Sequence, residues 1–448
     1  MKSEVLVSRV NDAGRIASLD IIRGIAILLI LVMNIRSMGS YAVELYDVRY
    51  PTWTSADYWA ALVSWTLLEG TQRGLLELLL GAGIMIMARC AMTADGPVEI
   101  ADIHFRRNIW LCLFGLANAF LLLWWGDVLL SYGLAAVFLF PFRKLGPKLQ
   151  CGIAAIVLAV LLSNSVHSYH QETTRLQQAE RLVAADAAGQ ALSQEDKAAL
   201  KDHRERLERR ALKPADNPIA REKIVKADKA HHSTFGAYWN AQREKWLFAM
   251  SLFWPFQAEI VATILIGMAL FQWGIIQGRA QSSIYWTMLI VGYAIGLTLR
   301  GGFYLEALAF QPGQRWQAMF AEEARLARTL GHVGLIHLIL RSSAGYRALK
   351  MFRAPGRMPL TVYLFTSFLM MWIVFAPWGL GLWGAWGHAK LLALAMMVIA
   401  AELVAANLWL RHFETGPMEW LWKSLTYWRR QPFRKPRDES DAPAALPV

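Results

Sequence analysis

Three polar residues, Asp20, Arg23 and Asn34, interrupt an otherwise apolar segment near the start of the chain. At 100° per residue, Arg23 and Asn34 lie three turns apart on one stripe of a helix, which passes close to Ile27 and Ile30. A charge in hydrocarbon is costly unless it is paired or faces a polar cavity. The spacing therefore predicts a helix that turns a polar stripe toward the interior of a bundle. The alternative is a positively charged anchor whose Arg23 reaches the lipid headgroups, which leaves Asn34 unexplained.

A second set of charged residues, Glu69, Arg73 and Glu77, is spaced four residues apart at the next apolar segment. This spacing predicts one helical face, and Gly81 and Gly83 follow it as residues that let helices approach closely. A ladder of carboxylate, guanidinium and carboxylate neutralises its own charge and suits helix packing. The functional interpretation makes Arg73 a ligand for an anionic substrate, with Glu77 beside it in the substrate site.

Asp127 follows Trp124, Trp125 and Gly126 in a short connection between two apolar segments. This position predicts a carboxylate at the outer membrane surface, immediately before a helix. Aspartate is a common N-cap residue there. A carboxylate at the mouth of a helical bundle can also act as a general base, or orient a hydroxyl or amine of a substrate. The sequence leaves both roles open.

Basic residues precede two other apolar segments: Arg106 and Arg107 precede one, and Arg357 lies in Gly356–Tyr363 before the other. Cations and a helix N-terminus on one face suit the phosphates of a nucleotide-bearing cofactor. The alternative is the ordinary excess of lysine and arginine in cytoplasmic loops.

The chain has 448 residues, 56 % of them hydrophobic, with 20 tryptophans and a mean hydropathy of +0.30. This composition is too apolar for an ordinary soluble protein of the same length. The formal net charge of +12 is explained by basic cytoplasmic loops, so nucleic acid is not expected as a partner.

No metal centre is predicted. His332 and His337 are five residues apart and diverge by about 140° around a helix. Cys90, Cys112 and Cys151 are widely separated and form no CxxC pair.

Apolar stretches that approach the length of a membrane-spanning helix recur along the chain, and we predict an all-α transmembrane bundle of about ten spans. They lie at residues 21–38, 74–90, 108–125, 128–142, 149–166, 247–276, 284–303, 330–340, 360–375 and 388–410. A polar insert, 167–246, separates an N-terminal membrane half, 1–166, from a C-terminal membrane half, 247–430. The proline-rich tail, 431–448, is expected to be disordered.

Loop charges predict the orientation of the bundle. The short basic loops fall on one side of the predicted spans, whereas loops 41–57 and 377–387 are acidic or uncharged. The positive-inside rule therefore predicts a cytoplasmic N-terminus and a cytoplasmic C-terminus. The insert then lies outside the cytoplasm, and the alternating charges of Glu195–Arg210 predict a solvated helix within it.

Five ordered motifs resemble the YeiB family of bacterial inner-membrane proteins, whose C-terminal half is a domain of unknown function. The motifs are Arg15…Ser18-Leu19-Asp20-x-x-Arg23-Gly24…Asn34, Leu78-Leu79-Leu80-Gly81-Ala82-Gly83, Arg106-Arg107…Gly126-Asp127, Gly356-Arg357-Met358-Pro359-Leu360-Thr361-Val362-Tyr363 and Phe413-Glu414-Thr415-Gly416-Pro417-Met418-Glu419 through Tyr427. The resemblance covers nearly the whole chain except the insert and the tail. It implies a multi-pass protein of the bacterial inner membrane.

The first motif is also similar to the start of heparan-alpha-glucosaminide N-acetyltransferase and other transmembrane acyltransferases. Those enzymes use cytoplasmic acetyl-CoA to acetylate a substrate on the far side of the membrane. The similarity implies a bundle with a cofactor channel and places Asn34 in its pocket. In the first outer loop, where the acetyltransferase has its catalytic histidine, this chain has Leu45, with Glu44 and Asp47 nearby.

We therefore expect an acyltransferase-like protein that moves an acyl group from cytoplasmic acyl-CoA to an envelope glycan or lipid. Asp127, Glu44 or Asp47 would replace the histidine as the base. Asn34 would polarise the acyl carbonyl. The expected cofactor ligands are Arg23, Arg106, Arg107 and Arg357.

A secondary transporter or permease for a small polar or anionic solute is the second interpretation, and the residues lining its path would be Arg23, Glu69, Arg73 and Glu77. A third is a non-catalytic assembly or lipid-binding role in which the insert docks a partner. In each case membrane lipid surrounds the protein, and a homo-oligomer is compatible with the sequence.

Overall fold

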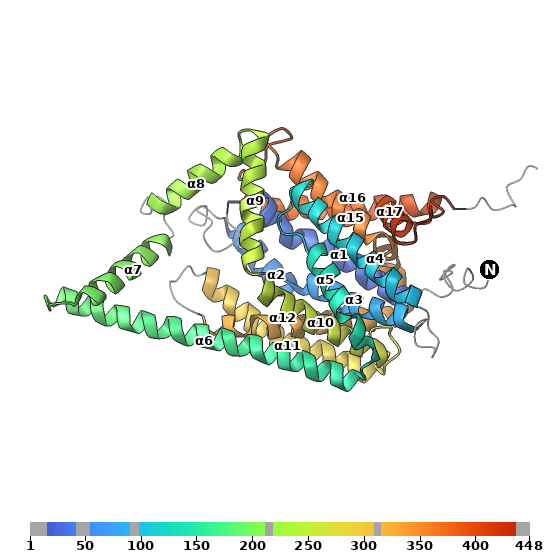
Figure 1. Ribbon diagram of the computed structural model, residues 1–448, viewed down its shortest axis with the longest axis horizontal. Helices are drawn as coiled ribbons and strands as arrows, with labels where there is room; N and C mark the ends of the chain where they lie inside the picture. Colours follow the sequence, from blue (N-terminus) through green and yellow to red (C-terminus); the bar gives the residue numbers. More distant parts are fainter. Residues whose placement is uncertain (1–15, 42–53, 90–97, 211–217, 309–314, 436–448) are drawn as a thin grey trace, which may run out of the picture.

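The computed structural model describes residues 16–41, 54–89, 98–210, 218–308 and 315–435. These residues form a bundle of packed helices from which the end of one long helix and the two helices after it project (Figure 1). Within these ranges there is no β-strand, and an isolated antiparallel bridge joins Phe413 to Arg434. The predicted all-α fold is therefore confirmed.

Seventeen α-helices follow one another along the described residues. In the first part they are α1 (Ala17–Gly39), α2 (Ser55–Leu68), α3 (Thr71–Arg89), α4 (Val98–Phe120), α5 (Leu129–Leu139), α6 (Pro147–Ala187), α7 (Gln194–Arg210), α8 (Pro218–His231) and α9 (Phe235–Ser251). In the second part they are α10 (Phe253–Gln272), α11 (Ser282–Leu308), α12 (Ala321–Leu340), α13 (Ser343–Leu349), α14 (Arg353–Arg357), α15 (Pro359–Phe368), α16 (His388–His412) and α17 (Pro417–Thr426). A π-helical segment, η7 (Leu369–Val374), extends α15.

Several helices begin at residues that favour helix starts. Proline occupies the first turn of α6, α15 and α17, at Pro147, Pro359 and Pro417, where its missing N–H costs nothing. Helix α2 begins with a capping box, in which the hydroxyl of Thr54 accepts from the Asp57 backbone and the Asp57 carboxylate accepts from the Thr54 backbone.

Each of the ten predicted apolar stretches contains a helix. Among the described residues, five helices are long and apolar enough to cross a membrane: α1, α6, α10, α11 and α16. The segments 343–357 and 359–374, which meet at a bend of 75°, make a sixth if they are one span. The remaining stretches lie in helices that are shorter, such as the 11-residue α5, or more charged, such as α12. The chain is a membrane protein with an α-helical bundle.

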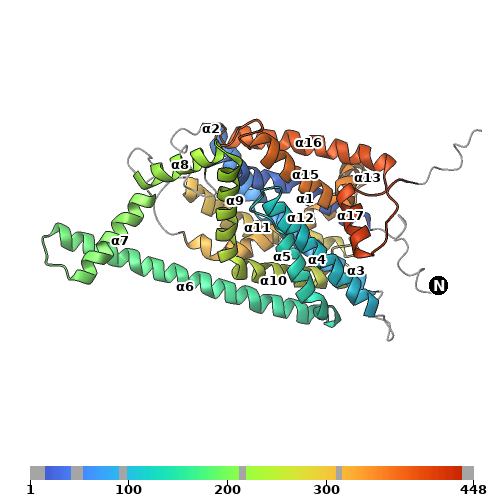
Figure 2. The ribbon, with the colours of Figure 1, turned by 45° about the horizontal axis from the view of Figure 1, so that its top comes forward.

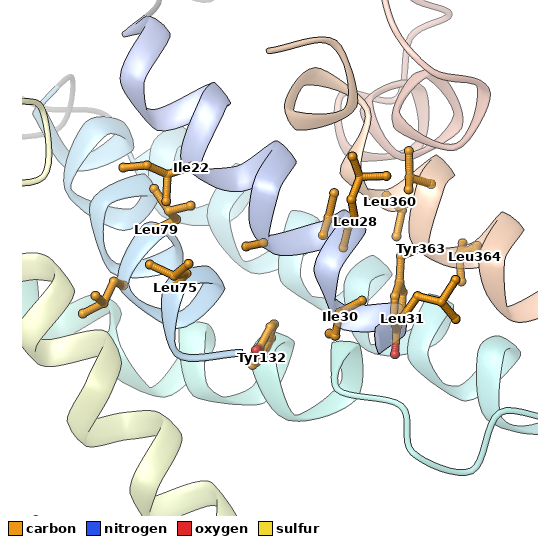
Figure 3. Close-up of a cluster of buried hydrophobic side chains, with 14 of the residues drawn as sticks. Ile22, Leu28, Ile30, Leu31, Leu75, Leu79, Tyr132, Leu360, Tyr363 and Leu364 are labelled. Carbon is orange, nitrogen blue, oxygen red and sulfur yellow. The ribbon is translucent and has the colours of Figure 1, made fainter. Parts of the chain in front are cut away.

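Helix α1 lies inside the bundle, packed against α3, α14, α15 and α16. Of its most apolar segment, 67 % is buried, compared with 11 % for α6 and 17 % for α11, which are peripheral. Helix α1 lies in the buried core between α3 and α15: Ile22 lies beside Leu79 of α3, and Leu31 lies near Tyr363 of α15 (Figure 3). Any site that α1 contributes to is therefore in the interior.

Two pairs of glycines set the closest helix contacts. A Cβ atom on Gly24 of α1 would lie 1.8 Å from the carbonyl oxygen of Phe352, and one on Gly356 of α14 would lie 1.7 Å from that of Asp20. Both positions therefore require glycine, because no side-chain atom fits between these backbones.

The second glycine pair joins α3 to α10. A Cβ on Gly81 would lie 2.3 Å from the carbonyl oxygen of Ile264, and one on Gly267 would lie 2.3 Å from that of Leu78. This contact is the close helix approach that Gly81 predicted.

The polar insert does not begin where a helix ends. Helix α6 is continuous over 41 residues, about 60 Å, so the predicted boundary between 166 and 167 falls inside it. The first part of α6 packs against α10, and its far end projects from the bundle together with α7; α8 and α9 lead the chain back (Figures 1 and 2). There the Tyr238 hydroxyl donates to the Met371 carbonyl oxygen at 3.3 Å. The predicted helix Glu195–Arg210 is confirmed as α7.

Candidate functional site: an amphipathic cavity beside α1

A cavity of about 300 Å³ lies between α1, α3, α4, α5, α15 and α17. Helix α1 lines it with Asp20, Arg23, Ile27 and Ile30, which is the stripe that the sequence predicted to face inward. Asn34 lies one turn beyond Ile30 on the same stripe and is half-buried, and it is not among the described residues that line the cavity.

Cationic side chains gather at one end of the cavity from four separate elements. The lining residues concerned are Arg23 of α1, Arg107 of α4, Arg357 of α14 and Lys423 of α17. Arg23 donates to the Asp20 carboxylate at 3.1 Å and to the Gly356 carbonyl oxygen at 3.3 Å. Arg357 donates to the Glu414 carbonyl oxygen at 3.2 Å. Three of these cations were predicted from the sequence as cofactor ligands. Lys423 was not, because only its place in the last motif distinguishes it from other lysines.

The adjacent arginines of α4 point in different directions. Arg107 lines the cavity, with its guanidinium 4.4 Å from the centroid of the Trp422 ring and 3.4 Å from the Met87 sulfur. No carboxylate of the described residues forms an ion pair with it. Arg106 instead pairs with Asp102 at 2.5 Å on the surface of the helix. The expectation that both arginines hold one cofactor is therefore not met, because successive residues on a helix diverge by 100°.

Glu419 lines the same end of the cavity, but its oxygens are occupied. They accept from the backbone N–H of Leu360 at 2.5 Å and of Thr361 at 3.0 Å, and from the Thr361 hydroxyl at 2.5 Å. Glu419 therefore caps the N-terminus of α15 from another helix. This contact joins the two C-terminal motifs of the sequence and fixes α17 beside the cations.

The body of the cavity is apolar. Its walls are formed mainly by aliphatic side chains from α1, α3, α4, α5 and α15: Ile27, Ile30, Leu76, Leu79, Leu80, Ile84, Leu111, Val128, Leu129 and Leu360. With cations at one end and aliphatic walls beyond them, the cavity suits an amphipathic anion.

Two tyrosines, Tyr132 and Tyr363, line the apolar part of the cavity (Figure 3). The Tyr363 hydroxyl donates to the Asp127 carboxylate at 3.4 Å. Asp127 also accepts from the Asn118 side chain at 2.9 Å and from the Leu130 backbone N–H at 3.1 Å. Asp127 itself is behind the wall, so Tyr363 is the group through which it reaches the cavity.

Asp127 lies deeper than the sequence predicted. A Cβ on Gly115 would be 2.5 Å from its Oδ2 atom, so Asp127 is level with Gly115, about 7 Å short of the end of α4 at Phe120. The connection after α4 folds back into the bundle, with Trp124 buried and Leu123 in the left-handed backbone region at φ 64°. The Asp127 carboxylate accepts from a backbone N–H in the first turn of α5, as a capping side chain does, although Val128 rather than Asp127 is the N-cap residue. The carboxylate is not at the surface of the bundle.

The predicted ladder of Glu69, Arg73 and Glu77 is wrong at its first residue. Helix α2 ends at Leu68, and Gly70 follows with φ +74° before α3 begins at Thr71. Glu69 therefore leaves the face of α3, and it pairs with Arg300 of α11. A period of four residues cannot reveal such a break, although the glycine could have suggested it.

Arg73 and Glu77 belong to a buried cluster that lies outside the cavity. Arg73 pairs with Glu77 at 3.6 Å and with Glu259 of α10 at 2.8 Å. Arg325 of α12 pairs with Glu77 at 3.3 Å, with Glu322 at 2.8 Å and with Glu259. The cluster holds α3, α10 and α12 together, and its two guanidinium groups pair with three carboxylates rather than face the cavity.

Two predicted bases, Glu44 and Asp47, lie outside the described residues. His104 is a cavity-lining residue that the sequence analysis did not identify; its Nε2 atom lies 2.9 Å from the Ala136 carbonyl oxygen. Over the described ranges, no group of three His, Cys, Asp or Glu side chains is placed to hold a metal ion.

Comparisons with known proteins agree with the motifs. Residues 270–429, which span α11 to α17, match the family described as "Protein of unknown function (DUF418)". The chain is 28 % identical over 437 residues to the uncharacterised protein YxaH of Bacillus subtilis (strain 168), covering 94 % of this chain and 96 % of that one. It is 26 % identical over 436 residues to the uncharacterised protein YeiB of Escherichia coli (strain K12), covering 92 % and 96 %. No solved structure matches. These similarities support the YeiB family that the motifs predicted: the chain resembles YxaH and YeiB over nearly its whole length, and residues 270–429 match DUF418.

Proposed function

We propose that this protein is a membrane-bound acyltransferase that binds acyl-CoA in the cavity and transfers the acyl group to an envelope glycan or lipid. The observation that supports the proposal is the cavity itself, with Arg23, Arg107, Arg357 and Lys423 at one end and aliphatic walls beyond them. Guanidinium and ammonium groups bind phosphates through charge-assisted hydrogen bonds. The aliphatic walls remove an acyl chain from water.

Asp127 and Tyr363 supply the proton transfer in this proposal. The substrate hydroxyl or amine attacks the thioester carbonyl, the bond to sulfur breaks, and the CoA thiolate leaves. The Tyr363 hydroxyl takes the proton of the attacking group while it passes its own proton to Asp127. Asn34, on the next turn of the cavity-lining stripe, would polarise the carbonyl. Glu44 and Asp47 are the alternative bases.

The orientation in the membrane is part of the proposal. The cationic end of the cavity is built from the start of α1, the first half of α4, α14 and α17. In the orientation predicted from loop charges, with both termini in the cytoplasm of a bacterial inner membrane, this end faces the cytoplasm. Acyl-CoA is cytoplasmic, so its phosphates would meet the cations first.

Acyl-CoA binding to the purified protein tests the proposal. Wild-type protein should be stabilised by acyl-CoA in a thermal-shift assay. Arg107→Ala should weaken binding by roughly 1.5–3 kcal/mol, or about 10- to 150-fold in Kd, because it removes a charge-assisted contact.

Arg106→Ala is the matched control for this experiment. It removes the same charge from the adjacent position, but Arg106 pairs with Asp102 away from the cavity, so binding should be unchanged. If wild-type protein gains no stability from acyl-CoA, or if both variants bind equally well, the acyltransferase proposal is wrong.

Solute transport is the second candidate function, because buried charges inside a membrane bundle often mark transport paths. The observation in its favour is the cluster around Arg73 and Arg325, which joins α3, α10 and α12. Stabilisation by a small anion in place of acyl-CoA, abolished by Arg73→Gln, would support this function.

A further inference from the structure

Helix α3 has glycine at positions 81 and 83, and the surroundings of these two residues differ. At Gly81 an added Cβ would collide with the backbone of α10, at 2.3 Å from the Ile264 carbonyl oxygen. At Gly83 an added Cβ would meet no atom within 4 Å. Packing therefore explains Gly81 and leaves Gly83 unexplained.

Gly83 faces the cavity. It lies on the stripe of α3 that lines the cavity, with Leu79 and Leu80 on one side and Met87 on the other. Its neighbours on this stripe present aliphatic side chains or a thioether, so the missing side chain leaves a notch in the wall. The open space beside its Cα is part of the cavity.

The notch stands directly beyond the cationic end. Met87 is one turn from Gly83 and lies 3.4 Å from the guanidinium of Arg107. A linear chain attached to an anionic group at Arg107 must pass Gly83 before it reaches the aliphatic walls at Leu79 and Ile30. A larger side chain at position 83 would close this passage while leaving the cations in place.

We propose that the cavity selects ligands with a long apolar chain, and that Gly83 admits this chain. The ligand class is a phosphate-bearing headgroup joined to a linear aliphatic chain, so the acyl group would be considerably longer than acetyl. This inference deepens the proposed function and rests on it for the choice of acyl-CoA as donor. A lysophospholipid has the same chemistry, and the experiment separates the two sources.

The test compares ligands of different chain length on protein in nanodiscs. For wild-type protein, the Kd of lauroyl-CoA should be lower than that of acetyl-CoA by about tenfold or more, because each buried methylene adds to affinity. In Gly83→Leu this difference should disappear, while acetyl-CoA, held mainly through its headgroup, should lose less than about threefold. A second series of measurements compares the Kd of lauroyl lysophosphatidate with that of glycerol phosphate, which has the phosphate headgroup without the chain.

Gly152→Leu is the control substitution. Gly152 is exposed on α6, and a Cβ there also meets no atom within 4 Å, but it does not line the cavity. Leucine favours a helix more than glycine does, so both variants should fold, and the Gly152→Leu variant should keep the chain-length dependence. The melting temperature without ligand checks the fold of each variant.

The possible results distinguish a failure of the chain site at Gly83 from a failure of acyl-CoA as the donor. If Gly83→Leu keeps the wild-type preference for the longer chain, the chain site is wrong even when Arg107-dependent binding of acyl-CoA stands. If chain length matters only for the lysophosphatidate, the chain site is supported and acyl-CoA as donor fails. If no ligand shows a dependence on chain length, the inference is overturned.

Discussion

The hydrogen-bond partners of Asp127 come from several parts of the chain, some of them distant in sequence. Its position immediately before an apolar segment predicted a contact with the start of the next helix, and in the structure it accepts from the Leu130 backbone N–H of α5. Its other partners, Asn118 and Tyr363, come from the end of α4 and from α15. Tyr363 is 236 residues away along the chain, and no spacing rule connects such residues. The sequence therefore indicated Asp127 as a candidate base, but its contacts with Asn118 and Tyr363 could be seen only in the structure.

We predict that Asp127→Asn abolishes acyl transfer without unfolding the protein. The Oδ1 atom of Asn118 is buried without a hydrogen-bond partner, so the Asn118 amide can turn and accept from the introduced amide. Asparagine also caps helices about as well as aspartate, so stability should change by less than about 1 kcal/mol. Loss of the base should lower the transfer rate by about 10²-fold or more. The measurement is acyl transfer by detergent-extracted protein, alongside its melting temperature.

Tyr363→Phe is the companion variant, since it removes the hydroxyl that links Asp127 to the cavity. Both variants should lose transfer and keep binding of acyl-CoA. Full activity in Asp127→Asn would remove Asp127 from the mechanism and leave Glu44 and Asp47 as the remaining bases.

The sequence also could not show which of the two neighbouring arginines of α4 faces the cavity. The sequence marked Arg106 and Arg107 equally, as two cations before an apolar stretch. Only the position of Trp422, whose ring lies against the Arg107 guanidinium, shows which side of α4 faces the cavity. Helical periodicity separates the two directions but does not say which one faces inward.

At the scale of helices, the first motif is explained by contact between α1 and α14. Gly24 and Gly356 allow these backbones to meet, and Arg23 donates to the Gly356 carbonyl oxygen across the contact. Two motifs that are more than 300 residues apart thus form one structural unit. The sequence contained both glycines, but nothing in either segment identified the other as its partner.

We predict that Gly24→Ala and Gly356→Ala each destabilise the protein by about 1–3 kcal/mol or more, because the added methyl group overlaps a backbone carbonyl. Thermal unfolding in detergent measures the loss. Gly152→Ala is the matched control: its Cβ enters open space on an exposed helical face, so it should be neutral or stabilising by up to about 1 kcal/mol. Equal melting temperatures for all three variants would contradict the packing described for α1 and α14.

The break between α2 and α3 shows why a regular period can mislead. Glu69, Arg73 and Glu77 fit a single helix, yet the chain turns at Gly70. The end of α2 is held by Arg328, which donates to the carbonyl oxygens of Thr66 at 2.8 Å and Glu69 at 3.0 Å. A buried cation at a helix C-terminus favours this arrangement over a continuous helix. That cation belongs to α12, so the local sequence could not reveal it.

For the whole molecule, hydrophobicity correctly predicted the positions of the helices. It was less accurate for the number of helices that can span a membrane. Every apolar stretch contains a helix, but five or six segments meet the length and composition of a span. The others, including α3 and α12, carry charges that pair with one another inside the bundle. A window of hydropathy cannot foresee such pairing, which depends on side chains from three helices.

We predict that the turn between α6 and α7 lies outside the cytoplasm and that the chain end near Arg434 lies inside. Alkaline phosphatase fused after Gly189, in that turn, should be active, and the same enzyme fused after Arg434 should be inactive. The physical reason is the excess of basic residues in the short loops on one side. The reverse pattern of activities would place the cationic end of the cavity away from cytoplasmic acyl-CoA and would exclude it as the entry for that donor.

The most direct test of a binding site in the cavity is to label the protein with a photoreactive acyl-CoA and to map the labelled peptides by mass spectrometry. If acyl-CoA binds in the cavity, the label should lie on the cavity-lining faces of α3 and α15, near Gly83 and Tyr363. Unlabelled acyl-CoA should displace this label, and Arg107→Ala should reduce it. Label confined to the outward faces of α6 and α11, unaffected by competing acyl-CoA, would show that the ligand dissolves in the surrounding lipid and would contradict a binding site in the cavity.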